Sequence, residues 1–221
     1  MTAEPIGAAP SEPRLSRLGL DVLTTRAATP PLAPRARSFT FLRHGATDGN
    51  VQKIYQRFDQ PLNALGLAQA HEAAAVLVAR GGIARIVASD MNRAWTTAGI
   101  VGEALGLPVE REIRLRERWF GDLVGTSSAN LDWALDPPNG DTLDDFIART
   151  RAGMLAALDT DVSTLVVAHG GNLNVVAAAL GVALGPEHMH NASPLVFTRS
   201  GGAWQAEILL ARSPDDLLAP T

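Results

Sequence analysis

The sequence predicts an α/β fold, a three-layer α/β/α sandwich around a mostly parallel sheet with an antiparallel edge strand. Two observations predict it. Between Ser38 and Gly181, short apolar runs of strand length alternate with longer segments of helical periodicity, which is typical of a parallel sheet covered on both faces. Beyond Gly181, two apolar runs flank Ser200-Gly201-Gly202, a pattern typical of an antiparallel hairpin that extends such a sheet.

Local signals justify the elements in chain order. The expected strands span residues 38–42, 83–89 and 163–170, with a further edge strand inside 106–119 and a closing hairpin over 193–210. The expected helices span residues 61–82, 90–105, 140–158 and 171–181. Asn63 is the expected N-cap of the first helix and Gly81 its stop, while Asp90 is expected to cap the second.

The chain is expected to hold one domain over residues 38–221, and no internal repeat suggests a second. Residues 1–37 are rich in Pro and Ala, so we expect a tail that is partly disordered or loosely packed. The stretch LSRLGLDVL inside it can form one or two helical turns. The tail carries five arginines and three acidic residues, which leaves a transit peptide as the alternative.

Bulk composition excludes several classes of function. The formal net charge of −4 supplies no basic field for nucleic acid. No stretch is long and apolar enough for a membrane span, so no membrane partner is expected. The absence of cysteine removes disulfides, thiol nucleophiles and thiolate metal sites together. A cysteine-free chain fits a reducing compartment, and we expect the protein in the cytoplasm.

Unusual residues follow three of the expected strands. The first strand ends on Arg43 and His44, the second feeds a helix whose first turn holds Arg93, and the third ends on His169. Ligands of open α/β sheets bind beyond the carboxyl ends of the strands, so these four side chains should meet on one rim. Arginines beside helix N-termini form an anion site. A neutral imidazole among them is a competent nucleophile, because the cations disfavour its protonated form.

Other polar and aromatic residues have two interpretations. His188 and His190 have a spacing that can bind metal, but no supporting acid or thiolate constellation exists, so a loop near the pocket and no metal are expected. Trp119, Phe120 and Trp133 can line an apolar part of the pocket or pack in the core. Trp95, on a predicted helix, favours packing.

Six motifs in order resemble one family. RHGATDGN matches the pattern R-H-G-x-S/T-x-x-N, followed by YQRFDQPLNALGLAQA, SDMNRAWTTA, LRERWFGDLVG, PPNGDT and VVAHGGNLNVV. Together they resemble the histidine phosphatase superfamily, often called phosphoglycerate mutase-like, from about Phe39 to Leu210. R-H-G alone is a weak signal, but six ordered matches are specific. The resemblance implies the phosphoglycerate mutase-like fold.

The resemblance also implies catalytic roles. His44 would be the nucleophile that forms a phosphohistidine. Arg43 and Arg93 would bind the phosphoryl oxygens, with His169 as a further contact. Glu117 would be the general acid for the leaving oxygen and then the base for water; taken alone, it is one charge in the run REIRLRERW.

A second group of residues is expected at the substrate. Asn50 would order the phosphate loop, Gln56 would lie near the substrate, and Arg57 could sit at the pocket mouth and prefer a second anionic group. Gly170 and Gly171 let the backbone approach the ligand closely. The chain departs from the family pattern at Arg57 and at three further positions, Val124, Asp141 and Asn174. These departures bear on substrate choice.

The predicted function is hydrolysis of a small phosphorylated metabolite, a phosphomonoester, through a phosphohistidine, without metal or cofactor. A phosphoglycerate mutase-type isomerase is the alternative, and a non-catalytic phosphate-binding protein is a weaker one. Family mutases carry a long insertion after the acid, whereas only a short segment separates Glu117 from Gly140 here, which favours hydrolysis. The edge strand of the final hairpin could pair across a homodimer.

Overall fold

The computed structural model describes residues 18–211 of the chain. Six strands form one sheet in the order β3-β2-β4-β1-β5-β6. The strands are β1 (Ser38–Arg43), β2 (Arg85–Ala88), β3 (Val109–Arg111), β4 (Thr164–Ala168), β5 (Pro194–Ser200) and β6 (Ala203–Ile208). Strands β1 to β4 pair in parallel, and β5 runs antiparallel to both β1 and β6. The predicted mixed sheet with its antiparallel edge is therefore confirmed.

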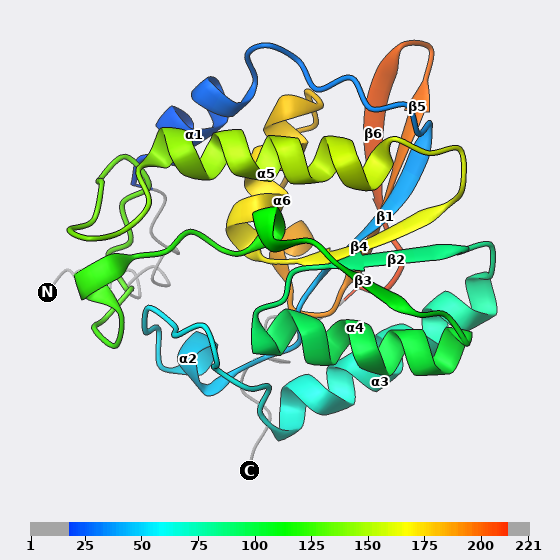
Figure 1. Cartoon of the computed structure of the whole chain (residues 1–221), viewed down its shortest axis with the longest axis horizontal. Coiled ribbons are helices and arrows are strands. Elements are labelled where there is room, and N and C mark those ends of the chain that lie inside the picture. Colours follow the sequence, from blue (N-terminus) through cyan, green and yellow to red (C-terminus); the bar gives the residue numbers. More distant parts are fainter. Residues whose placement is uncertain (1–17, 212–221) are drawn as a thin grey trace, which may run out of the picture.

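Helices cover both faces of the sheet, with α1, α5 and α6 on one side and α3 and α4 on the other (Figure 1). The α-helices are α1 (Leu20–Ala27), α2 (Asp48–Val51), α3 (Ala64–Arg80), α4 (Asn92–Leu105), α5 (Leu143–Leu158) and α6 (Gly170–Ala179). Three short 3₁₀ turns are η1 (Ile113–Leu115), η2 (Gly121–Leu123) and η3 (Pro186–Met189). The three-layer sandwich predicted from the sequence is confirmed.

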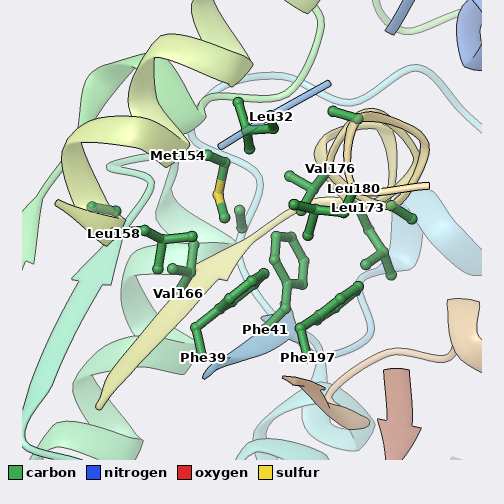
Figure 2. Close-up of a cluster of buried hydrophobic side chains, with 14 of the residues drawn as sticks. Leu32, Phe39, Phe41, Met154, Leu158, Val166, Leu173, Val176, Leu180 and Phe197 are labelled. Atoms are coloured by element: carbon green, nitrogen blue, oxygen red, sulfur yellow. The ribbon is translucent and has the colours of Figure 1, made fainter. Parts of the chain in front are cut away.

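The two cores follow from the alternation of side chains along each strand. Phe39 and Phe41 of β1 point to the α5–α6 side, where Met154 packs on them (Figure 2). Leu42 points to the opposite side, into the α3–α4 cluster. Phe39 also stacks on Phe197 of β5, with ring centroids 4.8 Å apart, which ties the antiparallel hairpin to the parallel sheet.

Two of the three residues expected to begin or end a helix, Asn63 and Gly81, do so in the structure. The Asn63 side chain accepts a hydrogen bond from the Gly66 N–H, and Gly81 ends the helix at φ 69°. The prediction that Asp90 caps the next helix is wrong, because Met91 occupies that position. Both Asp90 oxygens instead accept hydrogen bonds at 2.7 Å from Arg116, and this bidentate ion pair outcompetes a single cap bond.

The segment before β1 packs on the sandwich. Leu23 and Ala27 of α1 are fully buried in a third cluster with residues of α5 and α6. Arg151 of α5 donates hydrogen bonds to the carbonyl oxygens of Ala27 and Pro30. Residues 1–17 of the expected tail, including the start of LSRLGLDVL, lie outside the described residues, and the boundary at residue 37 stays a prediction. No helix within residues 18–211 has the length and apolar character needed to cross a membrane.

Candidate active site

Neighbouring strand ends bring the two histidines together. Strands β1 and β4 are adjacent and parallel, with Arg43 in register with Ala168, so His44 and His169 leave the sheet side by side. The His44 N–H donates to the Ala168 carbonyl oxygen at 3.0 Å. The imidazole ring centroids lie 5.2 Å apart. The expected convergence on one rim thus arises from sheet order, which the spacing along the chain does not reveal.

His44 is 3% exposed and presents one ring nitrogen to the site. Its Nδ1 lies 2.7 Å from the Gly45 carbonyl oxygen, which can only accept, so Nδ1 carries the proton. Nε2 therefore keeps its lone pair and accepts a hydrogen bond from Arg93 Nε at 3.3 Å. Burial lowers the pKa of His44 well below 6.5, and the charges of Arg93 and Arg43 lower it further. The imidazole is thus neutral near pH 7.

The buried guanidinium groups of Arg43 and Arg93 lie near this lone pair. Within residues 18–211, neither Arg43 nor Arg93 forms an ion pair with a carboxylate. Arg93 Nη1 donates to the Arg57 carbonyl oxygen at 3.0 Å, and Arg43 Nη1 donates to the Met189 carbonyl oxygen. Burial lowers the pKa of Arg93 to about 10 and also lowers that of Arg43, so both remain charged at neutral pH.

Two buried nitrogens on this rim lack partners among the described residues: Arg43 Nε and His169 Nδ1. Buried polar groups are nearly always hydrogen-bonded. His169 Nε2 lies 2.9 Å from the Ser89 hydroxyl, so a neutral His169 that accepts there holds its proton on Nδ1. Burial, followed by the charge of Arg93, lowers the pKa of His169 well below 6.5, which keeps it neutral. These two nitrogens without partners, next to Arg93 and the unprotonated Nε2 of His44, suit the binding of an anion.

Glu117 approaches the same rim from the segment between β3 and η2. Its Oε2 accepts from the Gly171 N–H at 2.9 Å and its Oε1 from the Arg118 N–H at 2.9 Å. A Cβ at position 171 would lie 2.2 Å from Glu117 Oε1, so the carboxylate can reach the start of α6 only beside glycine. A Cβ at Gly170 would instead lie 3.5 Å from Arg43 Nε, within ordinary contact.

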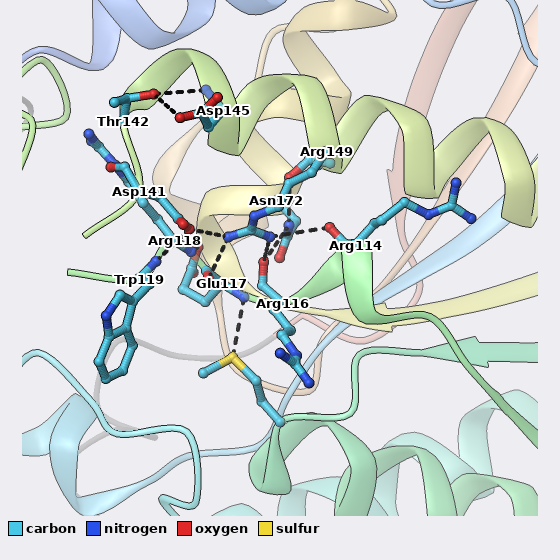
Figure 3. Close-up of polar contacts among 12 residues, drawn as sticks. Arg114, Arg116, Glu117, Arg118, Trp119, Asp141, Thr142, Asp145, Arg149 and Asn172 are labelled. Carbon is cyan, nitrogen blue, oxygen red and sulfur yellow. Dashed lines mark hydrogen bonds and ion pairs between the residues drawn. The ribbon is translucent and has the colours of Figure 1, made fainter. Parts of the chain in front are cut away.

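Arg149 of α5 holds the backbone around Glu117 (Figure 3). It donates to the carbonyl oxygens of Arg114, Arg116 and Glu117 and to a carboxylate oxygen of Asp141. The same Asp141 oxygen also accepts a hydrogen bond from the Trp119 N–H at 2.9 Å. Sequence reasoning missed Arg149, since it lies on an expected helix surface, and it noted Asp141 only as a departure from the family pattern.

Arg118 is a second support that sequence reasoning missed. Its side chain is fully buried and donates to the carbonyl oxygens of Trp133, Leu135 and Asp141. It also forms an ion pair with Asp136 at 2.9 Å. The segment from Glu117 to Asp141 is thereby folded around one guanidinium, and the only sequence signal was an arginine inside a charged run.

The loop after His44 is held by a capping box. Thr47 Oγ1 accepts from the Asn50 N–H at 3.1 Å, and Asn50 Oδ1 accepts from the Thr47 N–H at 3.2 Å. Asn191 Nδ2 donates to the His44 carbonyl oxygen at 2.9 Å and lies 3.4 Å from Asn50 Oδ1. Asn50 is therefore placed to order the loop. The half-buried Gln56 receives a hydrogen bond from Thr47 Oγ1 at 2.9 Å.

A cavity of about 480 Å³ adjoins Glu117. Its lining includes Phe58, Met91, Ile113, Trp119 and Arg116. Arg57, expected at the pocket mouth, is exposed and is not among the lining residues.

Of the aromatic residues expected either to line the pocket or to pack in the core, some do each. Trp119 is 40% exposed and lines the cavity, as expected for a pocket residue. Phe120 and Trp133 pack in the core instead. Trp95 packs beside the α3–α4 cluster, with the Arg111 guanidinium 5.1 Å from its ring centroid.

His188 lies in η3, next to the carbonyl that Arg43 contacts. Its Nδ1 accepts a hydrogen bond from the Gly185 N–H at 3.0 Å. The expected loop near the pocket is therefore present. Among residues 18–211, no three His, Cys, Asp or Glu side chains are grouped so that they could hold a metal ion.

Comparison with known proteins agrees with this geometry. The family model of the histidine phosphatase superfamily (branch 1) matches residues 39–210. Glucosyl-3-phosphoglycerate phosphatase of Mycobacterium tuberculosis is 38% identical over 170 residues, which cover 66% of this chain and 76% of that protein. A 2,3-bisphosphoglycerate-dependent phosphoglycerate mutase of Xanthobacter autotrophicus is 30% identical over 199 residues, covering 77% and 96%.

Solved structures show the same relationship. The mycobacterial glucosyl-3-phosphoglycerate phosphatase complexed with VO3 superposes with a TM-score of 0.64 at 33% identity, covering 78% of this chain and 97% of that one. A protein described as mycobacterial hydrolase 1 gives a TM-score of 0.68 at 32% identity, covering 80% and 99%. With the matched family model, this fold and the convergence of His44, His169 and Arg93, the chain belongs to the histidine phosphatase superfamily, branch 1.

Proposed function

We propose that the protein hydrolyses phosphomonoesters of small phosphorylated metabolites through a phosphohistidine on His44. The observation that carries the proposal is the unprotonated Nε2 of His44 beside two buried nitrogens that lack partners among residues 18–211, Arg43 Nε and His169 Nδ1. A phosphoryl group offers three oxygens to such donors and a phosphorus atom to the lone pair. The relatives support hydrolysis, since several are named as phosphatases.

In the first step, the phosphate oxygens bind Arg43, Arg93 and His169. Arg93 exchanges its hydrogen bond to His44 Nε2 for one to the phosphate, which frees the lone pair. Nε2 then attacks in line, the N–P bond forms and the P–O bond to the leaving group breaks. Glu117 gives its proton to the leaving oxygen.

In the second step, Glu117 removes a proton from water, and the resulting hydroxyl attacks the phosphorus. The N–P bond breaks and inorganic phosphate leaves, so His44 returns as neutral imidazole and Glu117 is again protonated. Arg43 and Arg93 supply the positive charge that phosphoryl transfer needs, so the proposal requires no metal or cofactor. Activity should survive treatment with a chelator.

The mutase alternative shares the first step and differs in the acceptor. A mutase returns the phosphoryl group to an organic hydroxyl, which requires a site closed against water. The short segment between Glu117 and Gly140 favours hydrolysis, while the mutase relative favours the alternative. Measuring phosphate release and phosphoglycerate isomerisation in parallel separates the two.

The test of the main proposal is a panel of phosphomonoesters with phosphate release measured and an alkaline denaturing quench that traps phosphate bound to the protein. We expect turnover and an acid-labile, alkali-stable phosphoprotein that His44→Ala abolishes. His71→Ala, an exposed histidine on α3, is the matched control and should behave as wild type. Full activity in His44→Ala would refute the nucleophile, and no turnover of any ester with no trapped phosphate would refute the enzyme.

We further propose that the enzyme is cytoplasmic, because phosphorylated metabolites occur in the cytoplasm and a chain without cysteine fits its reducing conditions. Strand β6 is the outer strand of the hairpin and offers an edge for pairing between two copies. Light scattering of the purified chain tests this homodimer, and a charged substitution on that edge should shift a dimer toward monomer.

A further inference from the structure

The cavity beside Glu117 is linked to the proposed phosphate site by one side chain, Met91. Met91 lines it, and the Met91 sulfur lies 3.7 Å from Arg93 Nη2 and 3.3 Å from the Glu117 backbone nitrogen. The same side chain thus touches a proposed phosphate ligand and the proposed acid. A leaving oxygen protonated by Glu117 carries the rest of the substrate, and this cavity is the adjacent space that can receive it.

The wall of this cavity is formed in part by apolar side chains that remain exposed. Trp119 and Phe58 are each 40% exposed, and Ile113 is 56% exposed. The Trp119 side chain extends away from the polar cluster around Arg149 (Figure 3). Exposed apolar side chains gathered at one concave site are typical of ligand binding, because a ligand with an apolar face removes them from water.

The positive charges of the arginines that line the cavity are already neutralised by carboxylates. Each lining arginine is paired with a carboxylate: Arg114 with Glu112 at 2.5 Å, Arg116 with Asp90 at 2.7 Å and Arg149 with Asp141 at 2.5 Å. Glu117, which also lines the cavity, offers no positive charge. Among residues 18–211, the buried guanidinium groups of Arg43 and Arg93 at the phosphate site form no ion pair with a carboxylate. The phosphate site can therefore compensate an anion, whereas the cavity cannot.

We propose that this cavity binds the leaving group of the substrate and selects an uncharged ring with an apolar face, such as a sugar or an aryl group. The proposal rests on the proposed phosphatase function and names the substrate class for that site. Trp119 supplies a flat apolar surface for the ring. A carboxylate on the leaving group would meet Glu117 and paired arginines, and it would lose hydration without gaining a free cation.

Matched substrates test the selection for an uncharged group. Benzyl phosphate and para-carboxybenzyl phosphate differ only in one carboxylate, and a hexose phosphate and the corresponding hexuronic acid phosphate form the sugar pair. We expect kcat/KM about tenfold higher for the uncharged member of at least one pair. The pair that shows the larger difference tells aryl from sugar.

Variants of the wall test the place of binding. Trp119→Ala should lower kcat/KM on the preferred ring about tenfold, with a clearly smaller loss on glycerol phosphate, and Trp119→Phe should recover part of it. Leu155→Ala removes a side chain that is 41% exposed on α5 away from the cavity and should leave both substrates unaffected. Inhibition by inorganic phosphate reports the phosphate site separately and should change little in Trp119→Ala.

Three outcomes would overturn the inference. Equal kcat/KM within both pairs, with glycerol phosphate still hydrolysed, would refute the cavity proposal and leave the phosphatase intact. A preference for the carboxylated members that Arg57→Ala abolishes would assign an anionic subsite to Arg57 instead. No hydrolysis of any ester would refute the proposed function itself.

Discussion

Arg149 of α5 donates a hydrogen bond from Nη2 to the carbonyl oxygen of Glu117 at 2.9 Å. Its Nη1 also contacts the carbonyl oxygens of Arg114 and Arg116, so one guanidinium holds three carbonyls of the segment that runs from η1 to Glu117. Asp141 accepts from the same Nη2 at 2.5 Å and balances the charge. The position of the proposed acid is therefore determined by a helix that carries no catalytic side chain.

Replacing Arg149 should harm the acid step more than phosphate binding. We expect Arg149→Met to lower kcat/KM on alkyl phosphates about a hundredfold, because small displacements of a catalytic group are costly. An aryl phosphate with a good leaving group needs less protonation and should lose much less. Arg149→Lys should retain part of the activity.

The matched control for Arg149 is Arg151→Met. Arg151 lies on the same helix and also donates to backbone carbonyls, but to those of Ala27 and Pro30. Thermal unfolding of both variants separates lost stability from lost positioning. Equal losses on alkyl and aryl phosphates, or the same selective loss in Arg151→Met, would contradict a positioning role for Arg149.

Glu117→Gln tests the acid directly. The amide cannot donate the proton that an alkoxide leaving group needs, so alkyl phosphates should slow by about 10²–10⁴. Turnover of p-nitrophenyl phosphate should fall far less. The control is Glu103→Gln, an exposed residue on α4. A uniform loss on both substrates would point to another acid.

The buried histidines should make stability depend on pH. Burial holds the pKa of His44 and of His169 well below 6.5, the ordinary value that applies in the unfolded chain. As the pH falls from 6.5 toward the lowered values, the unfolded chain binds protons that the folded chain does not. The contribution of the two neutral histidines to the free energy of unfolding is therefore complete above pH 6.5. As the pH falls below 6.5, this contribution decreases by about 1.4 kcal/mol per histidine for each pH unit.

Urea denaturation at about pH 7.5 and about pH 5 measures this dependence. The double variant His44→Gln/His169→Gln should flatten it, whereas His71→Gln should retain the wild-type difference. A wild-type slope that persists in the double variant would assign the pH dependence to other groups.

Two helical glycines should respond in opposite directions to alanine. A Cβ at Gly66 of α3 would lie 2.0 Å from the Ala46 carbonyl oxygen, so Gly66→Ala must displace the loop after His44. A Cβ at Gly99 of α4 would meet nothing within 4 Å, so Gly99→Ala should raise the free energy of unfolding, by up to about 1 kcal/mol. Denaturation and kcat/KM check both, and a stabilised, fully active Gly66→Ala would contradict the close approach.

Much of the fold was predictable because its signals are local. The apolar runs of β1, β2 and β4, the Asn63 cap and the hairpin turn each depend on neighbouring residues in the chain. The incorrect expectation for Asp90 shows where local reasoning fails. Its partner, Arg116, lies on another segment, and no signal near Asp90 reveals that a bidentate ion pair is available.

The proposed site was predictable to a similar extent. Arg43, His44, Arg93 and His169 follow strands, and parallel strands present their carboxyl ends on one edge. Arg118 and Arg149 were not predictable in the same way, since both act by donating to backbone carbonyls. Every residue carries a carbonyl, so the sequence contains no pattern that marks which ones an arginine will reach.

The order of residues thus determined the strand–helix alternation, the nucleophile candidate His44 and its family. These depend on periodicity and on short motifs, which are properties of consecutive residues. The tertiary structure alone decided that Arg43 Nε and His169 Nδ1 lack partners among residues 18–211, and that Trp119 rather than Trp133 faces a cavity. Burial, pairing and exposure arise from segments distant in the chain, and only packing of the whole domain sets them.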